Sequence, residues 1–170
     1  MKAPDTHSTN LSSAAMPDKP DLAENPTPTG KPSGFRTLVG YHVVVWRENY
    51  AEIELALGPQ HMNSVGITHG GVYMAMLDAA FGHAVTWCPV PAHVRRSVTL
   101  SLTTSFLTPA KTGVIKAVGR LEGVSERIAT ASGEVVDEAG QVLAVGQGSF
   151  RYFRGSERVE GVPRGSKAPR

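Results

Sequence analysis

One segment, from His61 to Val85, constrains the fold more than any other part of the chain: HMNSVGITHGGVYMAMLDAAFGHAV. After the pair Gly70 and Gly71, the run contains no Pro and no further Gly before Gly82, and it is rich in Ala, Met and Leu, which favour helices. The segment therefore predicts a turn-rich loop that leads into a long helix. The first N–H groups of a helix lack intrahelical partners and lie at its positive end, so this helix start can bind a negatively charged oxygen.

Asp78 is the only carboxylate in this segment. At 3.6 residues per turn it shares a helix face with Gly71, Met74, Gly82 and Val85. An Asp on a helix usually belongs to an exposed polar edge. This helix has almost no other polar residue to make such an edge, so its acid is expected to be either paired or functional.

Alternating apolar and polar residues predict strands on both sides of the helix. Before it, Tyr41–Trp46 and Tyr50–Leu57 form an expected hairpin, with its turn at Glu48 and Asn49. Four more strands are expected after it, over residues 96–107, 114–122, 127–137 and 142–153. We expect these four strands to pair in chain order as a meander. The single helix then packs across the concave face of a curled antiparallel sheet, which is an α+β fold.

The two ends of the chain differ from its centre. Residues 1–34 are rich in Pro, Ser and Thr and have few large apolar side chains, so they are expected to form a disordered tail. Residues 154–170 are basic and rich in Gly, and we expect a second flexible tail there. The remaining segment, 35–153, is long enough for one domain with a core.

Composition argues against several classes of protein. The net charge of +2 gives no reason to expect a nucleic-acid or membrane-surface partner. No stretch approaches the ~20 apolar residues of a membrane-spanning helix, and the N-terminus lacks the apolar core of a secretory signal. A single cysteine, Cys88, excludes an internal disulfide and a cysteine metal cluster. We therefore expect a cytoplasmic protein without a metal or other cofactor.

The loop and helix start also carry a longer motif, N-x-x-G-x-x-H-G-G-x6-D, formed by Asn63, Gly66, His69, Gly70, Gly71 and Asp78. This spacing resembles the signature of the PaaI-like hotdog-fold acyl-CoA thioesterases. The similarity continues through SVTLSLTTSFLTPAKTG and covers about residues 35–153. It implies a hotdog fold and an acyl-CoA substrate, and small residues near the acid, Ala75, Ala79 and Gly82, suggest room for an aryl or medium-chain acyl group. It also implies a homodimer or homotetramer whose active site lies at the subunit interface.

Thioester hydrolysis needs an activated water or a nucleophile, and a site for the developing oxyanion. The resemblance assigns Asp78 the first role, as general base or nucleophile. The N–H groups of Gly70 and Gly71 are the expected oxyanion donors. Asn63 can orient the water or the carbonyl, because its amide both donates and accepts hydrogen bonds. His69 can contact substrate or tie the loop to backbone, and we favour the second interpretation.

Four further residues are candidates for substrate binding. Met74 and Gly82 share the helix face of Asp78, and Arg96 and Lys111 are basic residues suited to the phosphates of coenzyme A. Some relatives carry a hydroxyl residue at the position of Gly82, one turn after the acid, to position the attacking water. In this chain that role has to come from elsewhere, with Thr86, Asn63, Ser97, Thr99 and a partner subunit as the candidates.

Two other functions stay open at this point. Some hotdog proteins bind acyl-CoA without hydrolysing it. Hotdog enoyl-CoA hydratases pair an Asp with a His five residues later, and here His83 has that spacing from Asp78. Their Asn-Pro pair is missing, however, and five residues along a helix turn His83 about 140° away from Asp78. We therefore expect the two side chains not to converge on one substrate.

Overall fold

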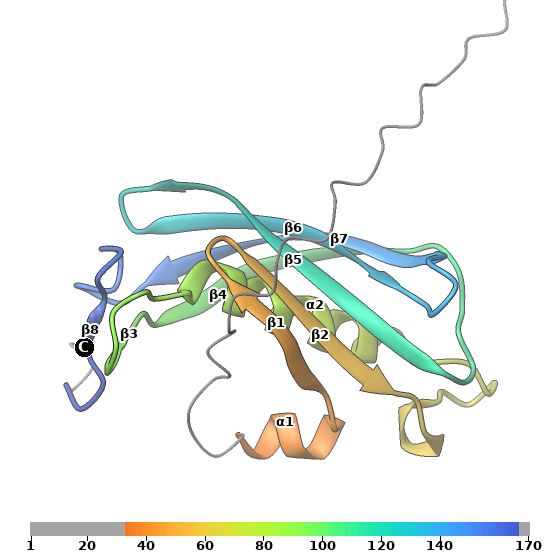
Figure 1. Cartoon of the computed structure of the whole chain (residues 1–170). Coiled ribbons are helices and arrows are strands. Elements are labelled where there is room, and N and C mark those ends of the chain that lie inside the picture. Colours follow the sequence, from red (N-terminus) through yellow and green to blue (C-terminus); the bar gives the residue numbers. More distant parts are fainter. Residues whose placement is uncertain (1–32, 167–170) are drawn as a thin grey trace, which may run out of the picture.

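The computed structural model describes residues 33–166 (Figure 1). The expected N-terminal tail lies outside the described residues except for its last two positions, and so do residues 167–170. The elements in chain order are α1 (Gly34–Val39), β1 (His42–Arg47), β2 (Tyr50–Ala56), the 3-10 helix η1 (Pro59–His61), α2 (Gly70–Thr86), β3 (His93–Val94), β4 (Ser97–Phe106), β5 (Val114–Ser125), β6 (Ile128–Val136), β7 (Val142–Tyr152) and β8 (Val162–Pro163).

The central helix and the six long strands confirm the predicted α+β architecture. In Figure 1 the antiparallel sheet curls around α2, which lies across its concave face. The alternation of side chains located each strand because one face of the sheet is buried against the helix. The short elements α1, β3 and β8 were not expected, since two to six residues carry too little periodicity to be recognised.

The order of the strands corrects the predicted meander. The sheet runs β1-β2-β5-β6-β7-β4, so β5, β6 and β7 pair in chain order, whereas β4 pairs with β7 at the far edge. The place beside β5 is taken by β2. The connection over residues 107–113 therefore crosses three strand spacings, about 14 Å. An extended chain of this length reaches about 23 Å, so the sequence pattern could not reveal which neighbour β4 would choose.

The packing of α2 on the sheet is close enough to bring backbones into contact. A Cβ atom added at Gly119 of β5 would lie 2.6 Å from the carbonyl carbon of Ala80 in α2. The absence of a side chain at this position allows the helix to rest directly on the sheet. The core that results is formed by residues of α2 and of the strands beneath it, chiefly Tyr73, Met76, Leu77, Phe81, Val85, Ile53, Leu55, Ile115, Val135 and Phe150.

The segment that follows β7 differs from the expected flexible tail. Residues 154–166 fold back as turns, and β8 pairs with β3 through His93 with Pro163 and Val94 with Val162. The guanidinium of Arg95 donates hydrogen bonds to the carbonyls of Ser156 at 3.0 Å and Glu157 at 3.4 Å. The basic composition suggested a solvated tail. Instead, backbone carbonyls of this segment bind the side chain of Arg95, about 60 residues earlier in the chain.

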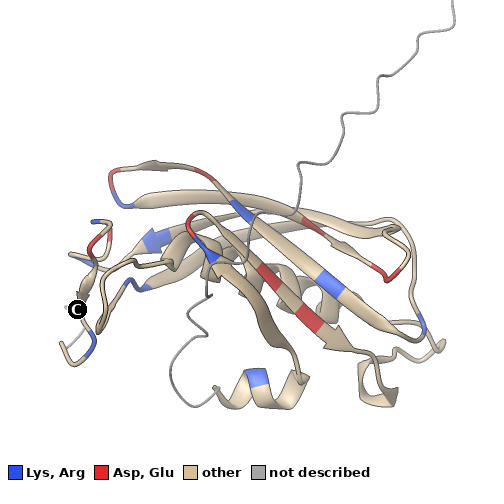
Figure 2. Ribbon diagram, viewed as in Figure 1, with Lys and Arg blue, Asp and Glu red and all other residues tan. Residues whose placement is uncertain are grey.

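Charged residues gather on the outer face of the sheet. Figure 2 shows acidic positions on β2 beside basic positions on β5. The ammonium of Lys116 lies 3.0 Å from Glu52 and 3.3 Å from Glu54, so the expected solvated face of β2 is partly paired. The Tyr50 hydroxyl donates a hydrogen bond to the Glu52 carboxylate at 2.6 Å. Burial and this neighbouring carboxylate raise the pKa of Tyr50. Among the described residues no helix is long and apolar enough to cross a membrane.

The contact between Gly119 and α2 gives a direct test of the packing. We expect Gly119→Ala to lower the free energy of unfolding by about 1–3 kcal/mol, because the added methyl group collides with backbone atoms that cannot rotate away. Denaturant unfolding measures the change. Gly123→Ala in the same strand is the matched control, since a Cβ there meets nothing within 4 Å. Equal stability of the two variants would contradict the backbone contact.

Candidate active site

The start of α2 is organised by His69. This residue caps the helix: its backbone is extended (φ −63°, ψ 134°) and its Nδ1 accepts a hydrogen bond from the Gly71 N–H at 2.9 Å. The ring therefore ties the loop to the helix, which is the role that the sequence interpretation favoured. Because Nδ1 is an acceptor, the neutral ring carries its proton on Nε2.

The cap changes the prediction for the oxyanion donors. The Gly71 N–H already binds His69, so it does not point freely at a ligand. The Gly70 N–H, by contrast, has no hydrogen-bond acceptor within the part of the chain that the structure describes. Of the two predicted donors, only Gly70 thus remains available in this conformation.

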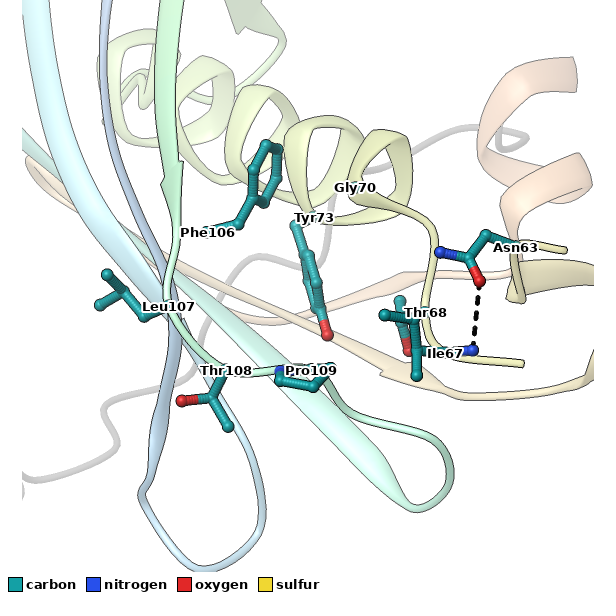
Figure 3. A pocket seen from close by; sticks show the side chains of 9 residues that line it. All are labelled: Asn63, Ile67, Thr68, Gly70, Tyr73, Phe106, Leu107, Thr108 and Pro109. Carbon is teal, nitrogen blue, oxygen red and sulfur yellow. Dashed lines mark hydrogen bonds between the residues drawn. The ribbon is translucent and has the colours of Figure 1, made fainter. Parts of the chain in front are cut away.

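A cavity of about 300 Å³ lies at this helix start, between the loop and the end of β4 (Figure 3). It is lined by Asn63, Ile67, Thr68, Gly70, Tyr73, Phe106, Leu107, Thr108 and Pro109. The ring of Phe106 covers Gly70, since a Cβ added to this glycine would lie 3.1 Å from the ring.

Asn63 is held by its own loop. Its Oδ1 accepts hydrogen bonds from the N–H groups of Val65 at 3.0 Å and Ile67 at 3.3 Å, the second of which is drawn in Figure 3. With the oxygen occupied, the amide can only donate to a ligand, and in Figure 3 its nitrogen lies on the side of the helix start.

Asp78 lies two turns further along α2 and borders a second cavity. Its Oδ1 accepts a hydrogen bond from the Thr99 hydroxyl of β4 at 2.7 Å, which leaves Oδ2 for another partner. This cavity of about 460 Å³ is lined by Asp78, Ala79, Gly82, His83, Thr86, Arg95, Arg96, Ser97, Thr99, Phe150 and Phe153. Asp78, Gly82 and Arg96 therefore come together. Thr99 was only one of several hydroxyl candidates, because sequence alone does not show which strand residue lies opposite the acid.

His83 corrects a geometric expectation. It borders the same cavity as Asp78, because the cavity is wide enough to extend around the helix. The ring is fixed, however: Nδ1 donates to the Ala79 carbonyl at 2.7 Å, and Trp46 lies edge-on at 5.6 Å. Trp46 Nε1 also donates to the His83 carbonyl at 2.8 Å. Burial lowers the pKa of His83 and favours the neutral ring.

The other predicted binding residues do not gather at one place. Met74 is 38% exposed and Lys111 is exposed on the β4–β5 connection. Arg96 and Lys111 lie before and after β4, a strand of 10 residues, and are therefore separated by about 34 Å along it. In one subunit they cannot hold the same phosphate. The Arg96 guanidinium donates to the carbonyls of Arg164 at 2.9 Å and Ser166 at 3.3 Å.

The oxyanion donor and the acid are also apart. Asp78 follows Gly70 by eight residues, which corresponds to about 12 Å along a helix. One carbonyl group cannot touch both within a single subunit. Within residues 33–166 no cluster of three or more His, Cys, Asp or Glu side chains is placed to hold a metal ion.

Comparison with known proteins adds the following. Residues 65–144 match the thioesterase superfamily. A Halobacterium salinarum protein named as a candidate esterase is 35% identical over 102 residues, which are 55% of this chain and 66% of that protein. The structure of a conserved Pseudomonas aeruginosa protein is similar with a TM-score of 0.63 and 25% identity, covering 71% of this chain and 94% of the other.

The PaaI protein of the Escherichia coli phenylacetic acid degradation operon is similar with a TM-score of 0.63, covering 71% of this chain and 84% of the other. Its identity of 19% shows the shared fold alone.

His83 provides a test by pH. A lowered pKa means that the unfolded chain binds a proton near pH 6.5 before the folded protein does, so stability falls as the pH is lowered through that value. We expect the free energy of unfolding of His83→Gln to depend less steeply on pH between about 6.5 and 5. Denaturant titrations across this range measure the slope. The exposed His42 on β1 supplies the control His42→Gln, and an unchanged slope in His83→Gln would contradict the assignment.

Proposed function

We propose that this chain, whose residues 65–144 match the thioesterase superfamily, hydrolyses acyl-CoA thioesters to a free acid and coenzyme A. One observation carries the proposal. The same helix presents a carboxylate held by a hydroxyl, Asp78 with Thr99, and an N–H without an acceptor among the described residues, that of Gly70. These are the two groups that thioester hydrolysis requires.

In the proposed reaction, Oδ2 of Asp78 takes a proton from water while the water oxygen attacks the carbonyl carbon. The Gly70 N–H stabilises the negative charge that develops on the carbonyl oxygen. The tetrahedral intermediate then expels the thiolate of coenzyme A, which is a good leaving group and needs no strong acid. The Thr99 hydroxyl keeps the carboxylate oriented, and the Asn63 amide donates to the water or the carbonyl. Direct attack by Asp78 is the alternative course of the same step.

The separation of about 12 Å between Gly70 and Asp78 favours a site shared by two subunits. β4 is one of the two edge strands of the sheet, and it exposes Val98 by 38%, Leu100 by 51% and Phe106 by 53%. An exposed, apolar edge strand is suited to pairing with a second copy.

The contacts of β4 with α2 indicate how two copies would meet. Thr99 of β4 binds Asp78, and Phe106 covers Gly70. Antiparallel pairing of β4 with β4 about a twofold axis near Leu102 and Thr103 sets position 99 of one copy opposite position 106 of the other. Gly70 of one subunit then lies on the side of the partner's Asp78. Each dimer would contain two such sites.

Two substitutions test the proposed groups. Asp78→Asn removes the base, and Gly70→Pro removes the N–H at the first helical position, where proline is tolerated. The extended backbone of His69 suits a residue that precedes proline. We expect Asp78→Asn to lower kcat by about 10²–10⁴. Gly70→Pro should lower it by about 10²–10³ in assays of thiol release. Gly70→Ala is the control, because it adds the same contact with Phe106 but keeps the donor.

Mixing the two inactive variants tests the shared site. Subunits carrying Gly70→Pro and Asp78→Asn, unfolded and refolded together, form mixed dimers in which one of the two sites has both intact groups. Random pairing predicts recovery of about a quarter of wild-type activity. No recovery, with mixed dimers confirmed by mass, would place both groups in one subunit. Wild-type rates in Asp78→Asn would end the assignment of the base, and tight binding of acyl-CoA without hydrolysis would indicate a binding protein.

A further inference from the structure

A third cavity, of about 500 Å³, adjoins the Asp78 cavity beyond the C-terminal end of α2. The two cavities share Thr86 and Arg95 in their walls. The larger part of the lining of this distal cavity is apolar, with Trp46, Trp87, Pro89, Val90, Pro91 and Val94. It therefore offers a hydrocarbon environment next to the proposed reaction site.

The distal cavity has a wall fixed by hydrogen bonds to the C-terminal segment. Besides Ser156 and Glu157, Arg95 donates to the Trp87 carbonyl at 3.3 Å, and its guanidinium lies 4.5 Å from the centre of the Tyr152 ring. Cys88 Sγ and His93 Nδ1 both donate to the Glu160 carbonyl, at 3.4 Å and 2.8 Å. The match to the thioesterase superfamily covers residues 65–144, so the segment that holds these side chains, residues 156–160, lies outside it.

We propose that the distal cavity holds the far end of an acyl group of about 12–14 carbons whose thioester lies at Asp78. This inference rests on the proposed function and names its substrate class. Thr86 follows Asp78 by eight residues, about 12 Å along the helix, which an extended chain of roughly ten carbons spans.

The path along the helix is lined by small residues, Ala79 and Gly82. A Cβ added at Gly82 meets nothing within 4 Å, so the space beside it is open. Acyl groups too short to pass Thr86 gain nothing from the distal cavity. Each methylene that enters an apolar cavity increases binding by roughly four-fold, so several of them produce a strong preference for longer chains.

The boundary residue provides the first test. We expect Thr86→Phe, which places a ring between the two cavities, to lower the ratio of kcat/KM for tetradecanoyl-CoA to that for acetyl-CoA by at least about ten-fold. Thr86→Val is the matched control: it removes the hydroxyl that donates to the Gly82 carbonyl at 2.6 Å but keeps the side chain small, so the ratio should stay within about two-fold. An unchanged ratio in Thr86→Phe would overturn the inference while the proposed hydrolysis stands.

A second test needs no hydrolysis. The chain has two tryptophans, Trp46 and Trp87, and both line the distal cavity. S-tetradecyl-CoA, a thioether that cannot be hydrolysed, should change the tryptophan emission of the wild-type protein, whereas S-methyl-CoA should not. Calorimetry shows whether each compound binds. Binding of S-tetradecyl-CoA with unchanged emission would overturn the inference, even if no acyl-CoA is hydrolysed and the proposed function itself fails.

Discussion

The direct contact between α2 and β5 determines most of this structure. Because Gly119 has no side chain, the helix backbone at Ala80 rests on the sheet, and the strands can curl around it. Eight of the 17 residues of the helix are buried. The sheet leaves one strip less covered, formed by Gly71, Met74, Asp78 and Gly82. The only acid of the helix lies on this strip, so its carboxylate avoids the cost of burial in the core.

The same geometry leaves the proposed site incomplete within one subunit. A straight helix carries the Gly70 N–H and the Asp78 carboxylate about 12 Å apart, and no movement of the side chain closes that distance. The strip between them borders β4, whose burial pattern is open on both faces. One of the two edge strands of the sheet, β4, thus lies next to the two proposed reactive groups. In the proposed dimer, pairing of β4 with the β4 of a second copy would extend the sheet and complete the site at the same time.

The sequence predicted what depends on local order. Alternation located the strands, and the run after Gly70 located α2, whose observed end is Thr86. Long-range partners were beyond reach: the pairing of β4 with β7, the contact of Thr99 with Asp78, and the hydrogen bonds of Arg95. Loop closure costs almost the same for several possible neighbours, so the pattern along the chain does not distinguish them. The motif indicated two glycine donors, but only coordinates show that His69 occupies one of them.

Arg95 and Arg96 show why the basic composition of the C-terminal segment led to the wrong prediction of a flexible tail. Of these two, Arg96 suggested a site for phosphate in the sequence, and the basic residues after 153 suggested a solvated tail. In the structure their guanidinium groups bind backbone carbonyls, which every residue possesses and no composition reveals. In the proposed reaction the motif from Asn63 to Asp78 supplies the reactive groups, whereas the distal cavity is lined by Trp46, residues 86–95 and Arg164, with Arg95 and His93 held by carbonyls of residues 156–160. The proposed chemistry and the proposed acyl selectivity thus depend on largely separate parts of the chain.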